Sequence, residues 1–278
     1  MYDGVSLSDG LQRATGELRV SVKRRGAESV LDGLRQAGCL KARFPRALMP
    51  GWYDMTTINS SGGVVGGDRL DTAISVGKGA RATIAAQAAE RIYRALPNST
   101  SSLVRTKVEI GADAAAEWLP QETILFDQCV LDRRLTIEMA VDSWFLGVEM
   151  LVFGRAAMGE RVLSARLRDL IRINRGEDLL LHDAIRLDGE VDLTLKRIAI
   201  ASGARAVATL VHVAPAAETR LDAVRTALTG VVEFGASAWN GMLIARILAG
   251  DGSVLRKGVT AALSVLRDGR PLPRVWLC

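Results

Sequence analysis

The stretch ELRVSVKRR, residues 17–25, alternates apolar and polar side chains with a period of two. Leu18, Val20 and Val22 fall on one side and mostly charged residues on the other, which is the pattern of a strand with one buried face. The pattern returns, with one slip of phase, in SLVRTKVEI (102–110), RLTIEMAV (134–141) and RAVATLVHVA (205–214). Turns that contain glycine separate these segments. The sequence therefore predicts a mainly β fold.

Helical periodicity appears late in the chain. Residues 215–230, PAAETRLDAVRTALTG, begin with a proline, carry acidic residues in the first turn and end in a glycine, which are start and stop signals of a helix. Residues 253–269, SVLRKGVTAALSVLRDG, place their apolar side chains on one stripe. Between them, WNGMLIARILAGDG (239–252) is apolar on both sides, like a buried strand that ends in a turn. We therefore expect a few helices, two of them near the C-terminus.

Acidic residues precede apolar segments at a roughly regular spacing. AAERIYR, PQETILF, GVEMLVF and LHDAIRL contain Glu90, Glu122, Glu149 and Asp183 in turn. A spacing of about 30 residues fits successive coils of a β-solenoid. We therefore expect solenoid-like stacked β-sheets, with three or four of these carboxylates aligned on one side. Since no linker divides the chain, we expect one domain over residues 1–278, with about residues 1–10 as a flexible tail.

Composition narrows the class of protein. The 278 residues carry a net charge of +5, and the basic residues are spread along the chain with few aromatic residues for base stacking, so an acidic protein partner is favoured over nucleic acid. No apolar run is long enough for a membrane helix, and the N-terminus does not resemble a signal peptide. The three cysteines, Cys39, Cys129 and Cys278, form no disulfide pattern. These features indicate a cytoplasmic protein without a membrane partner.

The glycine-rich stretch INSSGGVVGGDRL, residues 58–70, invites comparison with phosphate-binding loops. A P-loop needs a lysine after its last glycine, whereas Asp68 and Arg69 follow here. The stretch also matches neither a dinucleotide fingerprint nor a nucleophile elbow. We therefore expect a structural turn, with glycines at positive φ or at close backbone approaches and Asp68 capping the turn.

The ionisable residues leave two readings open. Only two histidines, His182 and His212, are present, so a histidine-rich zinc or nickel cage cannot form. Carboxylates near apolar strands need a partner, water or a cation. Those candidates are Glu90, Glu122, Asp127, Glu149 and Glu160. They either pair with the many arginines or line a water-filled interior path that holds a divalent ion weakly.

Several segments together resemble the urease accessory protein D family (UreD, also called UreH). They are GCLKARFPR, INSSGGVVGGDRLDTAISVGKGARATIAAQAAERIYR, WLPQETILFD, VFGRAAMGE, LDGE, TLVHVAPAAE and SAWNGMLIARILA, and they run in order from about residue 10 to the C-terminus. The glycine-rich stretch joined to the AAQAAE run is the most specific of them. Gln128 and Cys129 after ILFD, and Asp142 and Ser143 before the next strand, depart from the family's usual residues.

The resemblance implies a mostly β, solenoid-like fold without catalytic activity. Family members act as a scaffold between the urease apoprotein and the accessory proteins UreF and UreG, of which UreG is the nickel-carrying GTPase. It implies nickel in transit through a channel, no tightly bound cofactor, and no nucleic-acid or membrane partner. The family has no metal motif that transfers residue by residue. The candidate nickel-path residues therefore remain the five carboxylates above, together with Asp68 of the glycine-rich stretch.

One alternative is a β-solenoid carbohydrate-active enzyme that uses paired carboxylates. Such enzymes usually carry aromatic platforms for sugars and a secretion signal. The aromatic content of 5% and the plain N-terminus argue against this alternative.

Overall fold

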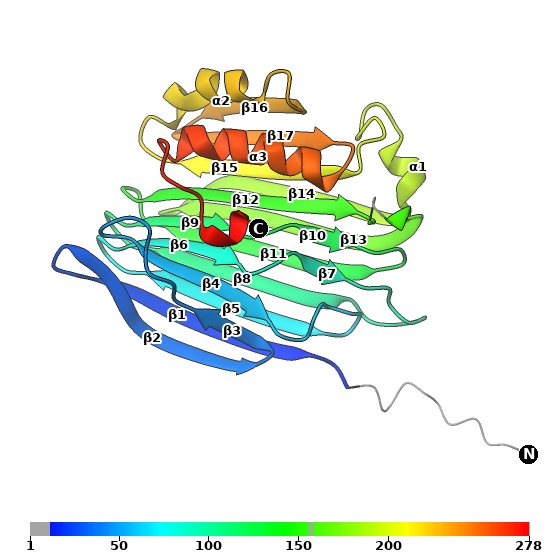
Figure 1. Cartoon of the computed structure of the whole chain (residues 1–278), viewed down its shortest axis with the longest axis horizontal. Helices are drawn as coiled ribbons and strands as arrows, with labels where there is room; N and C mark the ends of the chain where they lie inside the picture. The colour runs from blue at the N-terminus through cyan, green and yellow to red at the C-terminus, as the bar shows by residue number, and fades with distance from the viewer. Residues whose placement is uncertain (1–11, 156–157, 278) are drawn as a thin grey trace, which may run out of the picture.

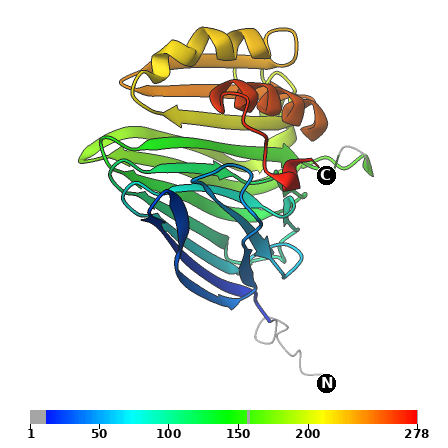
Figure 2. The ribbon, with the colours of Figure 1, turned by 60° about the vertical axis from the view of Figure 1, so that its left-hand side comes forward.

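The computed structural model describes residues 12–155 and 158–277, and its strands form two β-sheets that face each other (Figure 1, Figure 2). The expected tail at residues 1–10 lies outside the described residues. The seven-stranded sheet has the order β14 (Asp178–Glu190), β13 (Ser164–Arg175), β11 (Val130–Met139), β8 (Ser102–Ile110), β5 (Arg69–Val76), β1 (Thr15–Arg25) and β2 (Glu28–Gly38). The ten-stranded sheet has the order β16 (Glu233–Trp239), β17 (Met242–Ala249), β15 (Ala206–Val213), β12 (Trp144–Phe153), β9 (Ala115–Leu119), β6 (Arg81–Ala86), β4 (Tyr53–Asn59) and β3 (Leu40–Arg43). In that sheet the short β10 (Thr123–Leu125) pairs with β12 and with β7 (Glu90–Ile92).

Successive coils of the chain each place one strand in either sheet. In the seven-stranded sheet, parallel pairing joins β5 to β8 and β8 to β11. Each of these strands is followed along the chain by a strand of the ten-stranded sheet, where parallel pairing joins β6 to β9 and β9 to β12. Arg69 pairs with Leu103 and Leu103 with Asp132, so a coil takes about 30 residues, as in other repeat architectures. The prediction of a mainly β fold with stacked sheets is confirmed.

The two-residue alternation read from the sequence determines which side chains meet between the sheets. Leu18, Val20 and Val22 of β1 are at most 3% exposed and belong to the apolar core that also contains Ile84 and Phe145 of the facing sheet. The polar residues between them point outward. This core buries the inner faces of both sheets and holds the stack together.

The acidic residues that repeat along the sequence do not form one aligned row, so that expectation is wrong. Glu90 pairs with Thr123 rather than with Glu122, and Glu149 lies two positions before the residue of β12 that pairs with Thr123. Asp183 belongs to β14, in the other sheet. Because the side-chain period of a strand is two, small differences in coil length are enough to separate the carboxylates.

Two helices near the C-terminus are confirmed as α2 (Leu221–Leu228) and α3 (Gly252–Leu266). α2 begins later than predicted, after the 3-10 helix η2 (Ala217–Arg220), because Ala216 takes a φ of +61° that interrupts the helical path. Asp251 caps α3 by accepting a hydrogen bond of 2.9 Å from the backbone N–H of Val254. The remaining described helices are α1 (Val191–Leu195) and η3 (Arg274–Trp276). Within the described chain, no helix is long and apolar enough to cross a membrane.

The outer faces of the two sheets differ. α2 and α3 pack on the outer face of the ten-stranded sheet, where they form a second apolar core with β15 and β17, including Leu255 and Leu243 (Figure 2). The predicted strand in residues 239–252 is β17, which follows β16 through Asn240 and Gly241, both at positive φ as a two-residue hairpin turn requires. Among the described helices, α1 contacts β13 and β14 of the seven-stranded sheet, and its buried Val191 and Leu195 belong to the core between the sheets.

Candidate functional site

A cavity of about 230 Å³ is lined by residues of both sheets. β4, β7, β9 and β12 contribute from the ten-stranded sheet, and β5, β8 and β11 from the seven-stranded sheet. Its polar lining includes Glu90 and Glu149, two of the carboxylates singled out from the sequence, together with Arg133. Cavities of this kind, largely apolar with a few convergent polar groups, are the usual form of a binding site.

A buried ionic cluster centres on Arg133 at the wall of this cavity. Its Nη2 and Nε lie 2.7 and 2.8 Å from the two carboxylate oxygens of Asp169, and its Nη1 lies 2.6 Å from Oε2 of Glu149. The indole N–H of Trp118 donates to Oε1 of Glu149 over 2.7 Å. Arg133, Glu149 and Asp169 are 8%, 8% and 5% exposed, so the cluster is an interior feature that links the two sheets.

One guanidinium in this cluster faces two carboxylates. Burial raises the pKa of Glu149, and the charge of Asp169 adds to the rise while Arg133 opposes it. Burial alone would lower the pKa of Arg133, but Asp169 and Glu149 outweigh it and the pKa of the guanidinium is raised. Arg133 therefore stays charged, and the raised pKa of Glu149 favours uptake of a proton by this carboxylate.

Glu90 lines another part of the same cavity. Its Oε2 accepts a hydrogen bond of 3.0 Å from the side-chain amide of Asn59, and its Oε1 accepts one of 3.1 Å from the backbone N–H of Arg91. Burial raises the pKa of Glu90, and these hydrogen bonds only partly oppose the rise. Two carboxylates with raised pKa thus share one cavity.

Comparison with known proteins gives the family of the chain. A sequence model described as UreD urease accessory protein matches residues 14–277. The chain belongs to the UreD family. It is 41% identical over 266 residues to the urease accessory protein UreD of Azorhizobium caulinodans, covering 95% of this chain and 97% of that one. It is 45% identical over 260 residues to the UreD of a Methylobacterium species, covering 90% of each chain.

Asp68 does not line the cavity in this UreD chain. Its two oxygens accept hydrogen bonds of 2.9 and 2.8 Å from the backbone N–H groups of Val65 and Ala14, so it caps the glycine-rich turn as expected. Gly63, at a φ of +149°, also fits the structural reading, because a Cβ there would lie 2.3 Å from a ring atom of Tyr93. The stretch 58–70 is a turn next to the cavity, with Gly63 in its lining.

The remaining sequence candidates lie apart from the cavity lining and are already engaged. Glu122 pairs with Arg256 over 2.9 Å, and Glu160 pairs with Arg155 over 2.7 Å. Asp127 accepts hydrogen bonds of 2.8 and 3.0 Å from two backbone N–H groups at the start of β13. Glu122 and Glu160 thus show the arginine pairing considered from the sequence, whereas Asp127 is bound by the backbone instead. Among the described residues, no group of three or more His, Cys, Asp or Glu side chains is arranged to hold a metal ion.

Arg133, Asp169 and Trp118 were missed by the sequence reasoning. Arg133 occupies the inward phase of β11, between the buried Leu131 and Leu135, and Asp169 occupies the same phase of β13. A charged residue in the apolar phase of a strand was the available signal. Such a residue indicates a buried ionic group, but the sequence does not show which residue of another coil is its partner.

A second buried ionic cluster lies on the other side of the ten-stranded sheet. Glu117 of β9 is 0% exposed, and its oxygens lie 3.0 and 2.9 Å from Nε and Nη2 of Arg267. Arg270 adds a contact of 3.0 Å, and the hydroxyl of Thr83 donates over 2.8 Å. This cluster fixes the segment after α3 against the sheet.

Proposed function

We propose that this chain is a non-catalytic scaffold of urease maturation that connects the urease apoprotein with the accessory proteins UreF and UreG and helps to deliver nickel. Membership of the UreD family supports the role of a urease accessory protein. The named partners, the transit of nickel, the lack of enzymatic activity and the cytoplasmic location are part of the proposal, as is the action of the chain as one domain.

The proposal of nickel transit rests on the placement of Glu90 and Glu149 in one cavity. Carboxylate oxygens bind divalent cations, and a pair of them without histidine or thiolate donors binds such an ion weakly enough to release it. Glu149 fits this role because Arg133 is shared with Asp169, so the cluster contains more carboxylates than cations. An ion that reaches Glu149 displaces its proton or competes with Arg133.

The rival proposal of a solenoid enzyme acting on carbohydrate finds less support. Glycoside hydrolysis needs two carboxyl groups that flank a bound sugar in an accessible cleft. Glu149 and Asp169 are almost fully buried and bind the same guanidinium. This arrangement offers no room for a sugar between them.

An activation assay tests the proposed function. The urease subunits are co-expressed with the other accessory proteins, with and without this chain, and urease activity and urease-bound nickel are measured at limiting nickel. We expect both to fall strongly when the chain is omitted. Equal activity and equal nickel content in both preparations would refute the proposal, and a substrate screen for the solenoid enzyme would then be the next step.

A further inference from the structure

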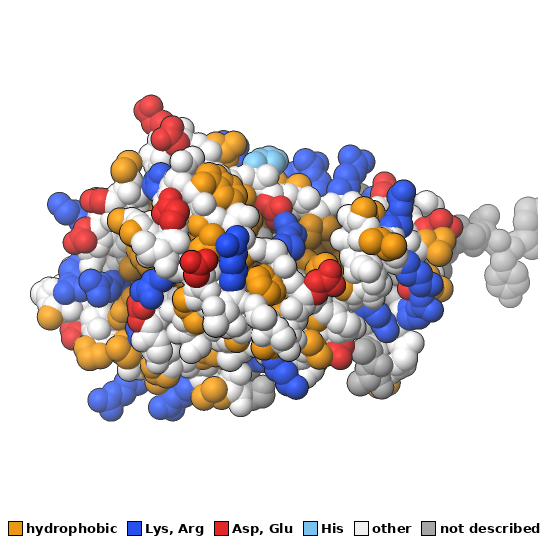
Figure 3. Space-filling view, turned by 90° about the horizontal axis from the view of Figure 1, so that it is seen from above, with side chains coloured by type: hydrophobic (Ala, Val, Ile, Leu, Met, Phe, Trp, Pro, Cys, Tyr) orange, Lys and Arg blue, Asp and Glu red, His pale blue; other side chains and the backbone are white. Residues whose placement is uncertain are grey.

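In the described part of the chain, the outer face of the seven-stranded sheet is exposed to solvent and carries many basic side chains. Its basic face consists of Arg105, Lys107 and Arg134 in the centre, on β8 and β11, and of Arg168, Arg172 and Arg186 at one edge, on β13 and β14. The chain has a net charge of +5. The end of the molecule that carries α2 and β16 shows basic, acidic and apolar side chains interspersed (Figure 3), so the excess of positive charge is not gathered there.

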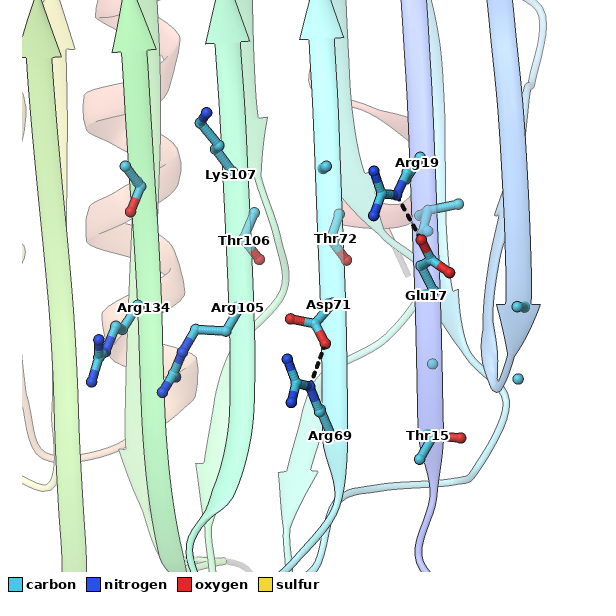
Figure 4. A pocket seen from close by; sticks show the side chains of 16 residues that line it. Thr15, Glu17, Arg19, Arg69, Asp71, Thr72, Arg105, Thr106, Lys107 and Arg134 are labelled. Atoms are coloured by element: carbon cyan, nitrogen blue, oxygen red, sulfur yellow. Dashed lines mark hydrogen bonds and ion pairs between the residues drawn. The ribbon is translucent and has the colours of Figure 1, made fainter.

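The centre of the basic face is hollowed. A depression of about 800 Å³ is lined by residues of β1, β5, β8 and β11. Arg105 and Arg134 are opposite each other in the parallel pair β8–β11, and their side chains extend in the same direction (Figure 4). Both hold Asp132, at 3.1 and 3.2 Å, so two guanidinium groups share one carboxylate and retain donors for another.

The edge of the basic face contains two facing arginines. Asp132 of β11 is the cross-strand neighbour of Arg168, but Arg105 and Arg134 already hold it. Arg168 and Arg186 are direct partners in the antiparallel pair β13–β14, and both are exposed. Among the described residues, no carboxylate forms an ion pair with either of them. Like charges placed opposite each other on a sheet destabilise it, so this arrangement costs stability in the isolated chain. A partner that supplies carboxylates between the two arginines removes that cost.

We propose that the basic face is a docking surface for an acidic protein, whose carboxylates bind Arg168 and Arg186 at the edge and Arg105 and Arg134 in the hollow. Bidentate pairing of arginine with carboxylate gives both strength and orientation to such a contact. The edge of this surface is separate from the proposed nickel path, because Arg168 and Arg186 do not line the cavity, whereas Arg134 of the hollow also belongs to the cavity lining.

Other polyanions fit this face less well than an acidic protein. The seven strands of the sheet contain no Phe, Trp or Tyr, so bases of a nucleic acid would find no stacking partner. Glu17 and Asp71 stand in the same hollow and bind Arg19 and Arg69 over 2.6 and 2.8 Å (Figure 4). A continuous phosphate backbone would meet these carboxylates, whereas spaced carboxylates on a protein can lie between them.

Binding of a labelled peptide to the full chain tests this proposal. The probe is a fluorescein-labelled peptide of six Glu-Asp-Gly repeats, followed by fluorescence anisotropy at low and physiological salt. The variant with Arg168→Gln and Arg186→Gln is compared with a control that carries Lys257→Gln and Arg197→Gln, which removes the same charge from exposed positions elsewhere. We expect the first variant to bind about tenfold more weakly and the control to bind nearly as well as the wild type.

Two further measurements complete the test. The thermal unfolding temperature of the Arg168→Gln, Arg186→Gln variant should equal or exceed that of the wild type, because the substitutions remove a like-charge pair. Equal weakening in both variants would show that only net charge matters and would overturn the proposal. Tighter binding of a random duplex DNA or of phosphatidylglycerol vesicles than of the peptide, lost in the same variant, would overturn it in favour of a nucleic-acid or membrane surface.

Discussion

Replacing Arg133 by methionine removes the one cation of the interior cluster while nearly preserving its volume. Glu149 and Asp169 then remain buried, each without an ionic partner. Removing one member of a buried ion pair typically costs about 3–5 kcal/mol, because the charge left behind is uncompensated. We therefore expect Arg133→Met to lower the free energy of unfolding at pH 7.5 by about 3–5 kcal/mol.

The pH dependence of this loss identifies its cause. In the wild type, burial holds the pKa of Glu149 above its ordinary value, so between those two pH values the folded protein binds more protons there than the unfolded chain. The contribution of Glu149 to the free energy of unfolding therefore grows as the pH falls through that window. Without Arg133, which lowers the pKa of Glu149, that pKa rises further, so the deficit of the variant should shrink between pH 7.5 and pH 5.

Urea unfolding at several pH values, followed by circular dichroism, measures these quantities. Arg134→Met is the matched control, since Arg134 is adjacent on β11 but its side chain is 40% exposed and its pairing with Asp132 is worth at most about 1 kcal/mol. Adding Glu149→Gln to Arg133→Met should restore part of the lost stability. A loss below about 1 kcal/mol, or a loss that does not diminish at pH 5, would refute the reasoning.

Three other substitutions or titrations probe the rest of the molecule. Glu117→Gln breaks the buried pair beneath the C-terminal segment and should lower the free energy of unfolding by about 3 kcal/mol, with faster hydrogen exchange in that segment. Gly63→Ala should destabilise the protein more than Gly62→Ala, because a Cβ at Gly63 meets Tyr93 at 2.3 Å while the space at Gly62 is open; equal melting temperatures would contradict this. Burial lowers the pKa of His212 to about 4, so the free energy of unfolding should fall as the pH drops from 6.5 towards 4, and NMR titration of the folded protein should show a neutral ring at pH 6.

The local pattern of the sequence predicts much of the fold. The alternation in residues 102–110 coincides with β8, and the start and stop signals place both C-terminal helices, one of them with a later start. The repeat spacing predicts stacked coils because each coil must supply one strand to each sheet. Strands can be predicted here because the alternation of buried and exposed side chains along a strand can be read from a short segment of sequence.

The candidate site is predicted only in part. Glu90 and Glu149 are brought into one cavity, whereas Asp68, Glu122 and Asp127 serve as caps or ion-pair partners. Which carboxylates meet depends on the register between coils, and that register differs by one or two residues from the sequence spacing. It is fixed by the turns and the packing of the whole stack, which a single sequence does not reveal.

The most direct test of the central claim is nickel-limited activation of urease with single carboxylate variants of this chain. Glu90→Gln and Glu149→Gln remove charges from the cavity, and Glu160→Gln, which removes a carboxylate outside its lining, is the control. Co-purification with the partner proteins shows whether each variant still assembles. We predict that both cavity variants assemble but activate urease several-fold less than the control at limiting nickel, with recovery at excess nickel. Activation by both cavity variants at the level of the control would contradict an interior nickel path through these residues.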